Sequence, residues 1–239
     1  MEPTIYKPSI YKGAGIYKTG AEGGGGGGGL TWFSSLKWNS NNAWSYNGAN
    51  ECFEQNLYDN GQGLGCMRCF DEINVTGRDK IEFGLNLFLE RRSTSNTYTG
   101  TIFHQQNFSG VSNGLVRLFR MNVMQGKTDT PKLLFTVPKN NYGDWDTESE
   151  ILIDLPGDFV CKVVVDYTQN KLLFSVNDVT GEKNLILTSP PVKFSPCFFM
   201  NAQNFRVNSF TTPHLMGNEK MYLNGTYMKI DNELIFGKE

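Results

Sequence analysis

Apolar and polar residues alternate along much of the chain between residues 73 and 211, which is the pattern of β-strands with one buried face. In residues 81–89 every odd-numbered position is Ile, Phe or Leu, and the even-numbered positions are mostly polar or Gly. A helix would spread these apolar residues around its whole surface. Strand signals recur at residues 115–123, 159–167 and 171–177, and no stretch shows a long helical period. The pattern predicts an all-β chain.

Turn signals separate these predicted strands. Residues 168–170 form a short polar connection between two β-rich segments and predict a hairpin. Asn224-Gly225 is the strongest short hairpin signal, because both central residues of such a turn need positive φ, and Asp231-Asn232 indicates another turn. We therefore expect an antiparallel β-sandwich over residues 30–212 and a small C-terminal β-meander over residues 213–239.

The first 29 residues have a different composition. The tripeptide Ile-Tyr-Lys occurs three times and is followed by seven consecutive glycines at residues 23–29. Three Ile-Tyr pairs cannot form a core, and Gly has the largest backbone entropy to lose on folding. Tyr is favoured where one side of the ring is buried and the hydroxyl is hydrogen-bonded. We predict that residues 1–29 are an anchor peptide and polyglycine tether that bind a partner protein through Ile5, Tyr6, Ile10, Tyr11, Ile16 and Tyr17.

Composition and charge limit the choice of partner. The 239 residues are 39% hydrophobic, which is enough to bury one large core or two small ones. The formal net charge of -2 gives no basic surface, so we do not expect nucleic acid to be a partner. No apolar run is long enough for a membrane helix or a secretory signal, so no membrane insertion is expected. A protein or a sugar is the expected partner.

No familiar catalytic or metal-binding motif is present. Cys66 and Cys69 form a CxxC pair, which could bind zinc with Cys52 or His104, but structural zinc sites usually have a second such pair. The five cysteines cannot all pair within one chain, and reduced thiols are expected. Neither His104 nor His214 lies in a metal or triad motif, and the glycine run lacks the Lys-Ser/Thr of a phosphate loop. The sequence therefore predicts no catalytic residue and no cofactor.

An acidic segment surrounds Trp145. On an extended strand Asp144, Asp146, Glu148 and Glu150 would share one face. Three interpretations remain open: a solvated acidic loop, a calcium site built from carboxylate oxygens, or the carboxylate pair of a glycoside hydrolase. The first interpretation is favoured because a loop signal comes directly before the segment. Calcium is the metal ion that this acidic segment leaves as an alternative.

Aromatic residues outside the predicted strands are candidates for stacking on sugar rings. Most aromatic side chains in a sandwich of this size belong to the core. Trp145 and Tyr142 are different, because both lie in a polar segment. We predict that these two residues contribute to glycan binding.

The order of strands at residues 157–167 and 172–177 resembles a known sandwich family. The first strand carries Gly157, Phe159 and alternating valines, and the second ends in Val176-Asn177 before a turn. This resembles the concanavalin A-like lectin and glucanase sandwich, particularly laminin-G-type domains, in which that second strand ends in Val-Asn-Gly. Here Asp178 replaces the final Gly. The resemblance covers residues 73–211 and implies a jelly-roll fold more than any activity. The E-x-D-x-x-E strand of the glucanases is absent.

The order of anchor, glycine tether and β-sandwich resembles fibre or decoration proteins of tailed bacteriophages. That resemblance implies a virion protein without enzymatic activity, assembled in the host cytoplasm and docked on other virion proteins. It implies a homo-oligomer, with a trimer favoured, that displays its β domain toward host or mucosal glycans. The alternative is a bacterial carbohydrate-binding module or glycoside hydrolase of the same fold. A further alternative is a capsid or tail component whose sandwich binds only neighbouring subunits.

Overall fold

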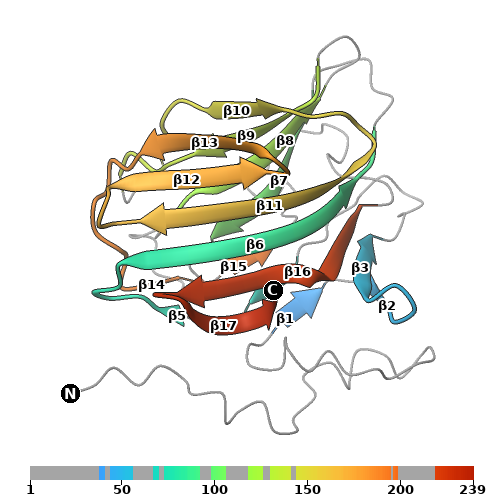
Figure 1. Ribbon diagram of the computed structural model, residues 1–239, viewed down its shortest axis with the longest axis horizontal. Helices are drawn as coiled ribbons and strands as arrows, with labels where there is room; N and C mark the ends of the chain where they lie inside the picture. The colour runs from blue at the N-terminus through green and yellow to red at the C-terminus, as the bar shows by residue number, and fades with distance from the viewer. Residues whose placement is uncertain are drawn as a thin grey trace, which may run out of the picture.

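Two antiparallel β-sheets pack face to face in the computed structural model of the chain (Figure 1). The structure describes residues 38–40, 44–55, 67–69, 73–91, 98–105, 118–125, 130–140, 144–194, 196–198 and 219–239. These residues contain strands and turns but no helix, and therefore none that is long and apolar enough to span a membrane. The prediction of an all-β antiparallel sandwich is confirmed.

The larger sheet lies in front in Figure 1 and is built around β6 and β11, whose ten-residue strands pair over their full length. Its hydrogen-bonded order is β13-β12-β11-β6-β16-β3-β2, and β17 also pairs with β16. The strands are β13 (Val179–Asn184), β12 (Lys171–Val176), β11 (Gly157–Asp166), β6 (Lys80–Leu89), β16 (Lys220–Ile230), β3 (Cys52–Gln55), β2 (Trp44–Asn47) and β17 (Glu233–Lys238).

The smaller sheet lies behind the larger one and has the order β1-β4-β15-β7-β8-β9-β10. Its strands are β1 (Trp38–Ser40), β4 (Met67–Cys69), β15 (Pro196–Phe198), β7 (Tyr98–Gln105), β8 (Arg120–Gln125), β9 (Lys132–Thr136) and β10 (Ser149–Leu152). A separate pair is formed by β5 (Ile73–Asn74) and β14 (Lys193–Phe194). β4 and β15 become neighbours although they are far apart in the sequence, so this sheet depends on long-range pairing.

The core fills the space between the inner faces of the two sheets. In β6 the alternating apolar positions are the buried ones, as the pattern predicts. Phe103 stacks on Phe119 with ring centroids 4.4 Å apart, and Phe135 stacks on Phe174 at 4.2 Å. Such pairs are worth about 0.5–1.5 kcal/mol beyond the area that they bury. The Phe135–Phe174 contact joins β9 of the smaller sheet to β12 of the larger sheet, and Phe83 of β6 lies 4.7 Å from Phe103 of β7 between their ring centroids.

Two predicted turns have different outcomes. Residues 168–170 connect β11 to β12 in a hairpin, with Asn170 at φ 55°, so that prediction is confirmed. The predicted turn at Asn224-Gly225 is wrong, because β16 continues through it as a bulge between the pairs Tyr222↔Asn86 and Tyr227↔Gly84. The Asn86 side chain donates a hydrogen bond of 2.8 Å to the Asn224 carbonyl, which holds the bulge against β6. Gly225 has a φ of 85°, and this left-handed backbone conformation is part of the bulge.

The C-terminal hairpin turns at Asp231-Asn232, where φ is 49° and 70°. One carboxylate oxygen of Asp231 accepts hydrogen bonds from the backbone N–H groups of Asp79 and Lys80, at 3.0 and 2.9 Å. These bonds tie the turn to the start of β6. The C-terminal segment is therefore part of the larger sheet, and the predicted boundary at residue 213 lies outside the described residues.

Candidate functional site

Polar residues form a row across the smaller sheet. In β15, Cys197 pairs with Arg68 of β4 on one side and with His104 of β7 on the other. Asn39 of β1 pairs with Arg68 and extends the row. Directly opposite residues of antiparallel neighbours lie on the same face of a sheet. Register therefore places Arg68 and His104 on one face, two strands apart.

This face is the outer one, because Phe103, the neighbour of His104 in β7, belongs to the core between the sheets. β7 pairs with β8, and Phe103 lies directly opposite Met121. Arg120 precedes Met121, so it lies at the level of His104 on the adjacent strand. The outer face of the smaller sheet thus brings Arg68, His104 and Arg120 into one cross-strand row, which we call the basic row.

Arg120 is held between an aromatic ring and a carboxylate. Its guanidinium carbon lies 4.7 Å from the centroid of the Trp145 ring, and its Nη2 lies 3.8 Å from Oε1 of Glu148. Burial lowers the pKa of Arg120, and Glu148 partly offsets that effect. The guanidinium keeps its charge at neutral pH because its ordinary pKa is above 12. Trp145, predicted to bind glycan, therefore lies half-buried beside the basic row.

The outer-face residues next to Arg120 are shielded from solvent. Thr136 pairs with Arg120, and Asn122 pairs with Leu134. These three neighbours are only 1–4% exposed, although Leu134 does not belong to the core cluster between the sheets. Charges act more strongly on one another where water is excluded. A ligand charge that reached Arg120 would therefore interact strongly with it.

Each carboxylate of the acidic segment around Trp145 has a different partner. Asp144 accepts a hydrogen bond of 2.7 Å from the Asn140 amide. The other three carboxylates each pair with a cation, and the pair with Lys183 holds the pKa of Asp146 below its usual value. Within the described residues, no cluster of three or more His, Cys, Asp or Glu side chains is arranged to hold a metal ion. The ion pairs are Asp146–Lys183 at 2.8 Å, Glu148–Arg120 at 3.8 Å and Glu150–Lys132 at 2.6 Å.

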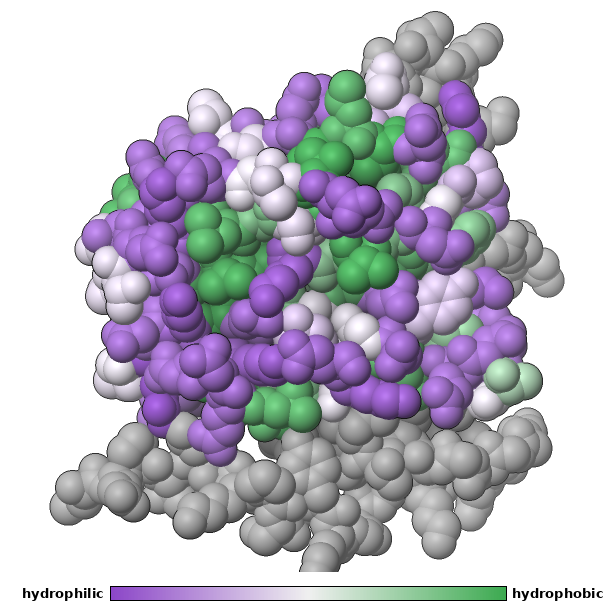
Figure 2. Space-filling view, viewed as in Figure 1, coloured by the Kyte–Doolittle hydropathy of each residue, from purple (hydrophilic) through white to green (hydrophobic). Residues whose placement is uncertain are grey.

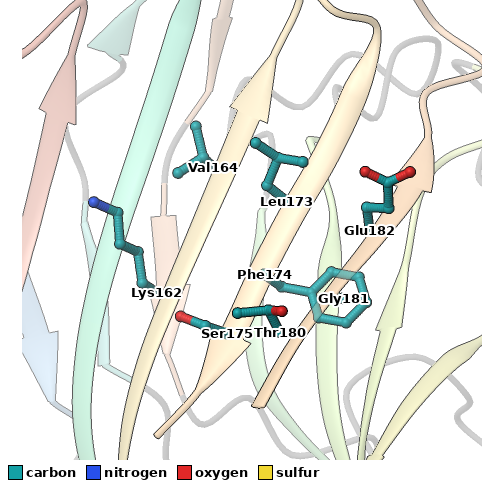
Figure 3. A pocket seen from close by; sticks show the side chains of 8 residues that line it. All are labelled: Lys162, Val164, Leu173, Phe174, Ser175, Thr180, Gly181 and Glu182. Carbon is teal, nitrogen blue, oxygen red and sulfur yellow. The ribbon is translucent and has the colours of Figure 1, made fainter. Parts of the chain in front are cut away.

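A second surface feature lies on the outer face of the larger sheet. A groove of about 520 Å³ runs over β11, β12 and β13 (Figure 3). Its floor includes Val164 and Leu173, which are directly opposite each other in β11 and β12. Ser175 and Thr180 form the next cross-strand pair. Figure 2 shows this side of the molecule, where apolar surface is divided by hydrophilic residues.

A hydrogen-bonded cluster lies on β6 and its neighbours on the same face. Oε1 of Glu82 accepts a hydrogen bond of 2.8 Å from the Tyr227 hydroxyl and lies 2.9 Å from Nζ of Lys162. Burial and the Glu82 carboxylate raise the pKa of Tyr227, so its phenol is protonated at neutral pH. The Tyr227 ring covers Gly84, and Nζ of Lys229 lies 5.1 Å from the ring centroid.

Several residues that the sequence singled out lie outside the described residues. These are Tyr142 and the six anchor positions Ile5, Tyr6, Ile10, Tyr11, Ile16 and Tyr17. Conversely, sequence reasoning missed the basic row, because it considered His104 only as a possible zinc ligand and no local pattern links Arg68, His104 and Arg120. One sequence signal that points toward this surface is the aromatic and charged segment around Trp145.

Comparison with known proteins gives a fold and no sequence family. No family model matches the chain, and no curated protein sequence matches it. Solved structures do match, and those described here are jelly-roll β-sandwiches. Alginate lyase A1-II', a member of polysaccharide lyase family 7, superimposes with a TM-score of 0.54 at 11% identity over 81% of this chain and 86% of that chain.

Two further structures show the range of proteins with this fold. The family 7 alginate lyase AlyA1 from Zobellia galactanivorans gives a TM-score of 0.53 at 10% identity, over 81% of this chain and 83% of the lyase. The binding domain of botulinum neurotoxin DC, solved with SialylT, gives a TM-score of 0.51 at 11% identity, over 85% of this chain and 44% of the neurotoxin chain. The chain therefore shares the jelly-roll β-sandwich fold of these structures, which confirms the predicted fold class.

These likenesses correct two expectations. The prediction that the chain is not an enzyme is contradicted, because the similar structures include several polysaccharide lyases. The resemblance to phage fibre proteins finds no support in the structures named above, which are alginate lyases and a neurotoxin binding domain. They favour the alternative of a carbohydrate-active protein over the virion interpretation.

Proposed function

We propose that this chain binds an acidic polysaccharide at the basic row of the smaller sheet and cleaves it by β-elimination. The observation that carries the proposal is the register that aligns Arg68, His104 and Arg120 in the basic row. The likeness to alginate lyases supports it, since one of those structures is an alginate lyase variant with a histidine and a tyrosine replaced, solved with substrate.

The basic row supplies what elimination from a uronate sugar requires. A base removes the proton on the carbon that bears the carboxylate, and the freed electron pair forms a carbon–carbon double bond. The bond to the glycosidic oxygen on the next carbon breaks, and that oxygen takes up the proton that the base now carries. No water is consumed, so the products are a new chain end and an unsaturated uronate. Neutralising the carboxylate makes the proton easier to remove.

His104 is the candidate base. Histidine is the side chain that most often serves as a general acid or base in enzymes. Arg120 lies on the adjacent strand, where a guanidinium can neutralise the carboxylate of the sugar that reacts. Strands are about 4.8 Å apart, so the backbone positions of Arg68 and His104 lie about 10 Å apart in the basic row.

Trp145 and Glu148 have supporting roles in this proposal. Trp145 offers an aromatic surface beside Arg120, and aromatic rings favour the apolar faces of sugars. Glu148 keeps the Arg120 guanidinium oriented through their ion pair. This deepens the prediction that Trp145 takes part in glycan binding.

The test is incubation of the full chain with polymannuronate, polyguluronate and polygalacturonate, with a neutral glucan as control. The ultraviolet absorbance of the unsaturated product reports elimination directly. The two histidines provide a matched pair of variants. We expect His104→Asn to lose at least about 100-fold in rate, because general bases contribute about that much or more, and His214→Asn to keep its activity.

Other outcomes would contradict the proposal. Absence of an unsaturated product from all three polyuronates would exclude elimination on these substrates. Cleavage of the neutral glucan alone would indicate hydrolysis by another site. If His214→Asn lost activity and His104→Asn kept it, the basic row would not be the catalytic surface.

The anchor peptide is proposed as a separate device for attachment to a partner protein, and virion proteins are its candidate partners. Deleting residues 1–29 should leave polysaccharide cleavage unchanged and abolish incorporation into a particle or complex. Retained incorporation of the truncated chain would refute the anchoring role.

A further inference from the structure

We infer that the groove on the larger sheet is a second saccharide site, which takes an uncharged segment of a sugar chain. It lies over β11, β12 and β13, on the sheet opposite to the basic row (Figure 3). The inference goes beyond the proposed cleavage, because it involves different residues and a different face of the molecule.

The floor of the groove is apolar. Val164 and Leu173 are directly opposite each other on adjacent strands, and both are half-buried. Figure 3 shows the two side chains next to each other on the same face of the sheet. A pyranose ring has an apolar face made of C–H groups, and covering such side chains removes apolar surface from water at roughly 25 cal/mol per Å².

The sides of the groove carry hydroxyl groups. Ser175 of β12 and Thr180 of β13 are paired in register, next to the apolar floor. Neither hydroxyl has a hydrogen-bond partner within the described part of the chain. A hydroxyl can both donate and accept a hydrogen bond, so these two groups can bind the hydroxyl groups of a sugar as donors or as acceptors.

The charges at the rim are already paired. Nζ of Lys162 lies 2.9 Å from Glu82, and Nζ of Lys171 lies 2.5 Å from Glu182. The two pairs together carry no net charge. An acidic sugar would have to compete with Glu82 for Lys162, whereas a neutral sugar leaves both pairs intact. Charge therefore favours an uncharged ligand here and an acidic one at the basic row.

The size of the hollow also fits a short ligand. Small-molecule sites are typically about 300–1,000 Å³, and the groove has a volume of about 520 Å³. A protein partner would need a surface of about 800 Å² on each side for a stable complex. A hollow over three strands suits a few sugar units of a longer chain better than it suits a second protein.

The experiment is calorimetric titration of the full chain with four neutral hexasaccharides, namely cellohexaose, maltohexaose, mannohexaose and xylohexaose. We expect binding of at least one of them. Leu173→Arg places a charged side chain on the groove floor and should weaken that binding at least tenfold. Leu234→Arg is the matched control, because Leu234 is 41% exposed on β17, outside the groove, and should bind as the wild type does.

Three results would overturn the inference: no binding of any of the four hexasaccharides, unchanged binding by Leu173→Arg, or a self-association of the wild type that Leu173→Arg removes. The last result would identify the groove as an interface between copies of the chain. His104→Asn should retain hexasaccharide binding. Loss of polyuronate cleavage and loss of hexasaccharide binding are therefore separate outcomes, so failure of the proposed function can be distinguished from failure of this site.

Discussion

Replacing Gly84 with Ala should destabilise the larger sheet through one side chain, Tyr227. Gly84 and Tyr227 are directly opposite each other in β6 and β16. A Cβ atom at position 84 would lie 2.1 Å from Cε1 of Tyr227 and 2.5 Å from its Cδ1. Distances this short are not tolerated, so the ring must move. The Tyr227 side chain is nearly buried, at 7% exposure, and has little room to do so.

Two costs follow from moving the ring. Crowding an extra methyl group into a packed site costs about 1–3 kcal/mol. The hydroxyl of Tyr227 also leaves Glu82, at present 2.8 Å away, and a hydrogen bond to a charged acceptor is worth about 1.5–3 kcal/mol. Glu82 keeps its ion pair with Lys162, which reduces the second cost. We expect a total loss of about 3 kcal/mol, or a fall in Tm of about 6–12 °C.

The assay is urea unfolding of the wild type, Gly84→Ala, Tyr227→Ala and the double variant, followed by circular dichroism. In the Tyr227→Ala background the ring is absent, so Gly84→Ala should cost less than about 0.5 kcal/mol, and the coupling energy should be at least about 2 kcal/mol. Ser175→Ala, on the same outer face, is the control for a generic substitution. An equal cost of Gly84→Ala in both backgrounds would refute the steric argument.

Three other predictions concern packing and ionisation. Burial alone would raise the pKa of Asp166, but hydrogen bonds and the 3.1 Å pair with Lys80 hold it below its usual value. Because the pKa of Asp166 is lower in the folded state, its ionised carboxylate stabilises the fold at pH values above the unfolded pKa of about 3.9, and this stabilisation is lost as the pH falls from there through the folded pKa. Asp166→Asn should therefore lower the free energy of unfolding by about 1–3 kcal/mol at pH 7 and flatten the acid limb of a stability–pH profile. An unchanged acid limb would contradict this reasoning. Gly181→Ala would place a Cβ 2.4 Å from the Phe174 ring and should cost about 1–3 kcal/mol in thermal unfolding, whereas a neutral effect would show that Phe174 can repack. Burial raises the pKa of Cys161 to about 12, so in a thiol-titration assay this cysteine should react with a disulfide reagent only after denaturation, and rapid labelling of Cys161 in the native protein would count against the buried placement.

The local pattern of the sequence was sufficient for the strands. Alternation at residues 81–89 predicted β6, because a strand exposes every second residue to the same environment whatever its partners are. The connection at residues 168–170 predicted the hairpin between β11 and β12, because a tight turn is decided by the residues within it. The same local logic failed at Asn224-Gly225, where Asn86 of a distant strand stabilises a bulge in place of a turn.

The candidate sites required the tertiary structure. Trp145 was recognised in the sequence because it stands in a polar segment, but its neighbour Arg120 was not. Arg68 and His104 become neighbours in the basic row through β15, whose pairing with β4 and β7 is long-range. Register between distant strands depends on how both sheets pack around one core, and no local pattern encodes it. The sequence by itself therefore determined several strands and the fold class, whereas the packing of the two sheets decided which side chains share a surface.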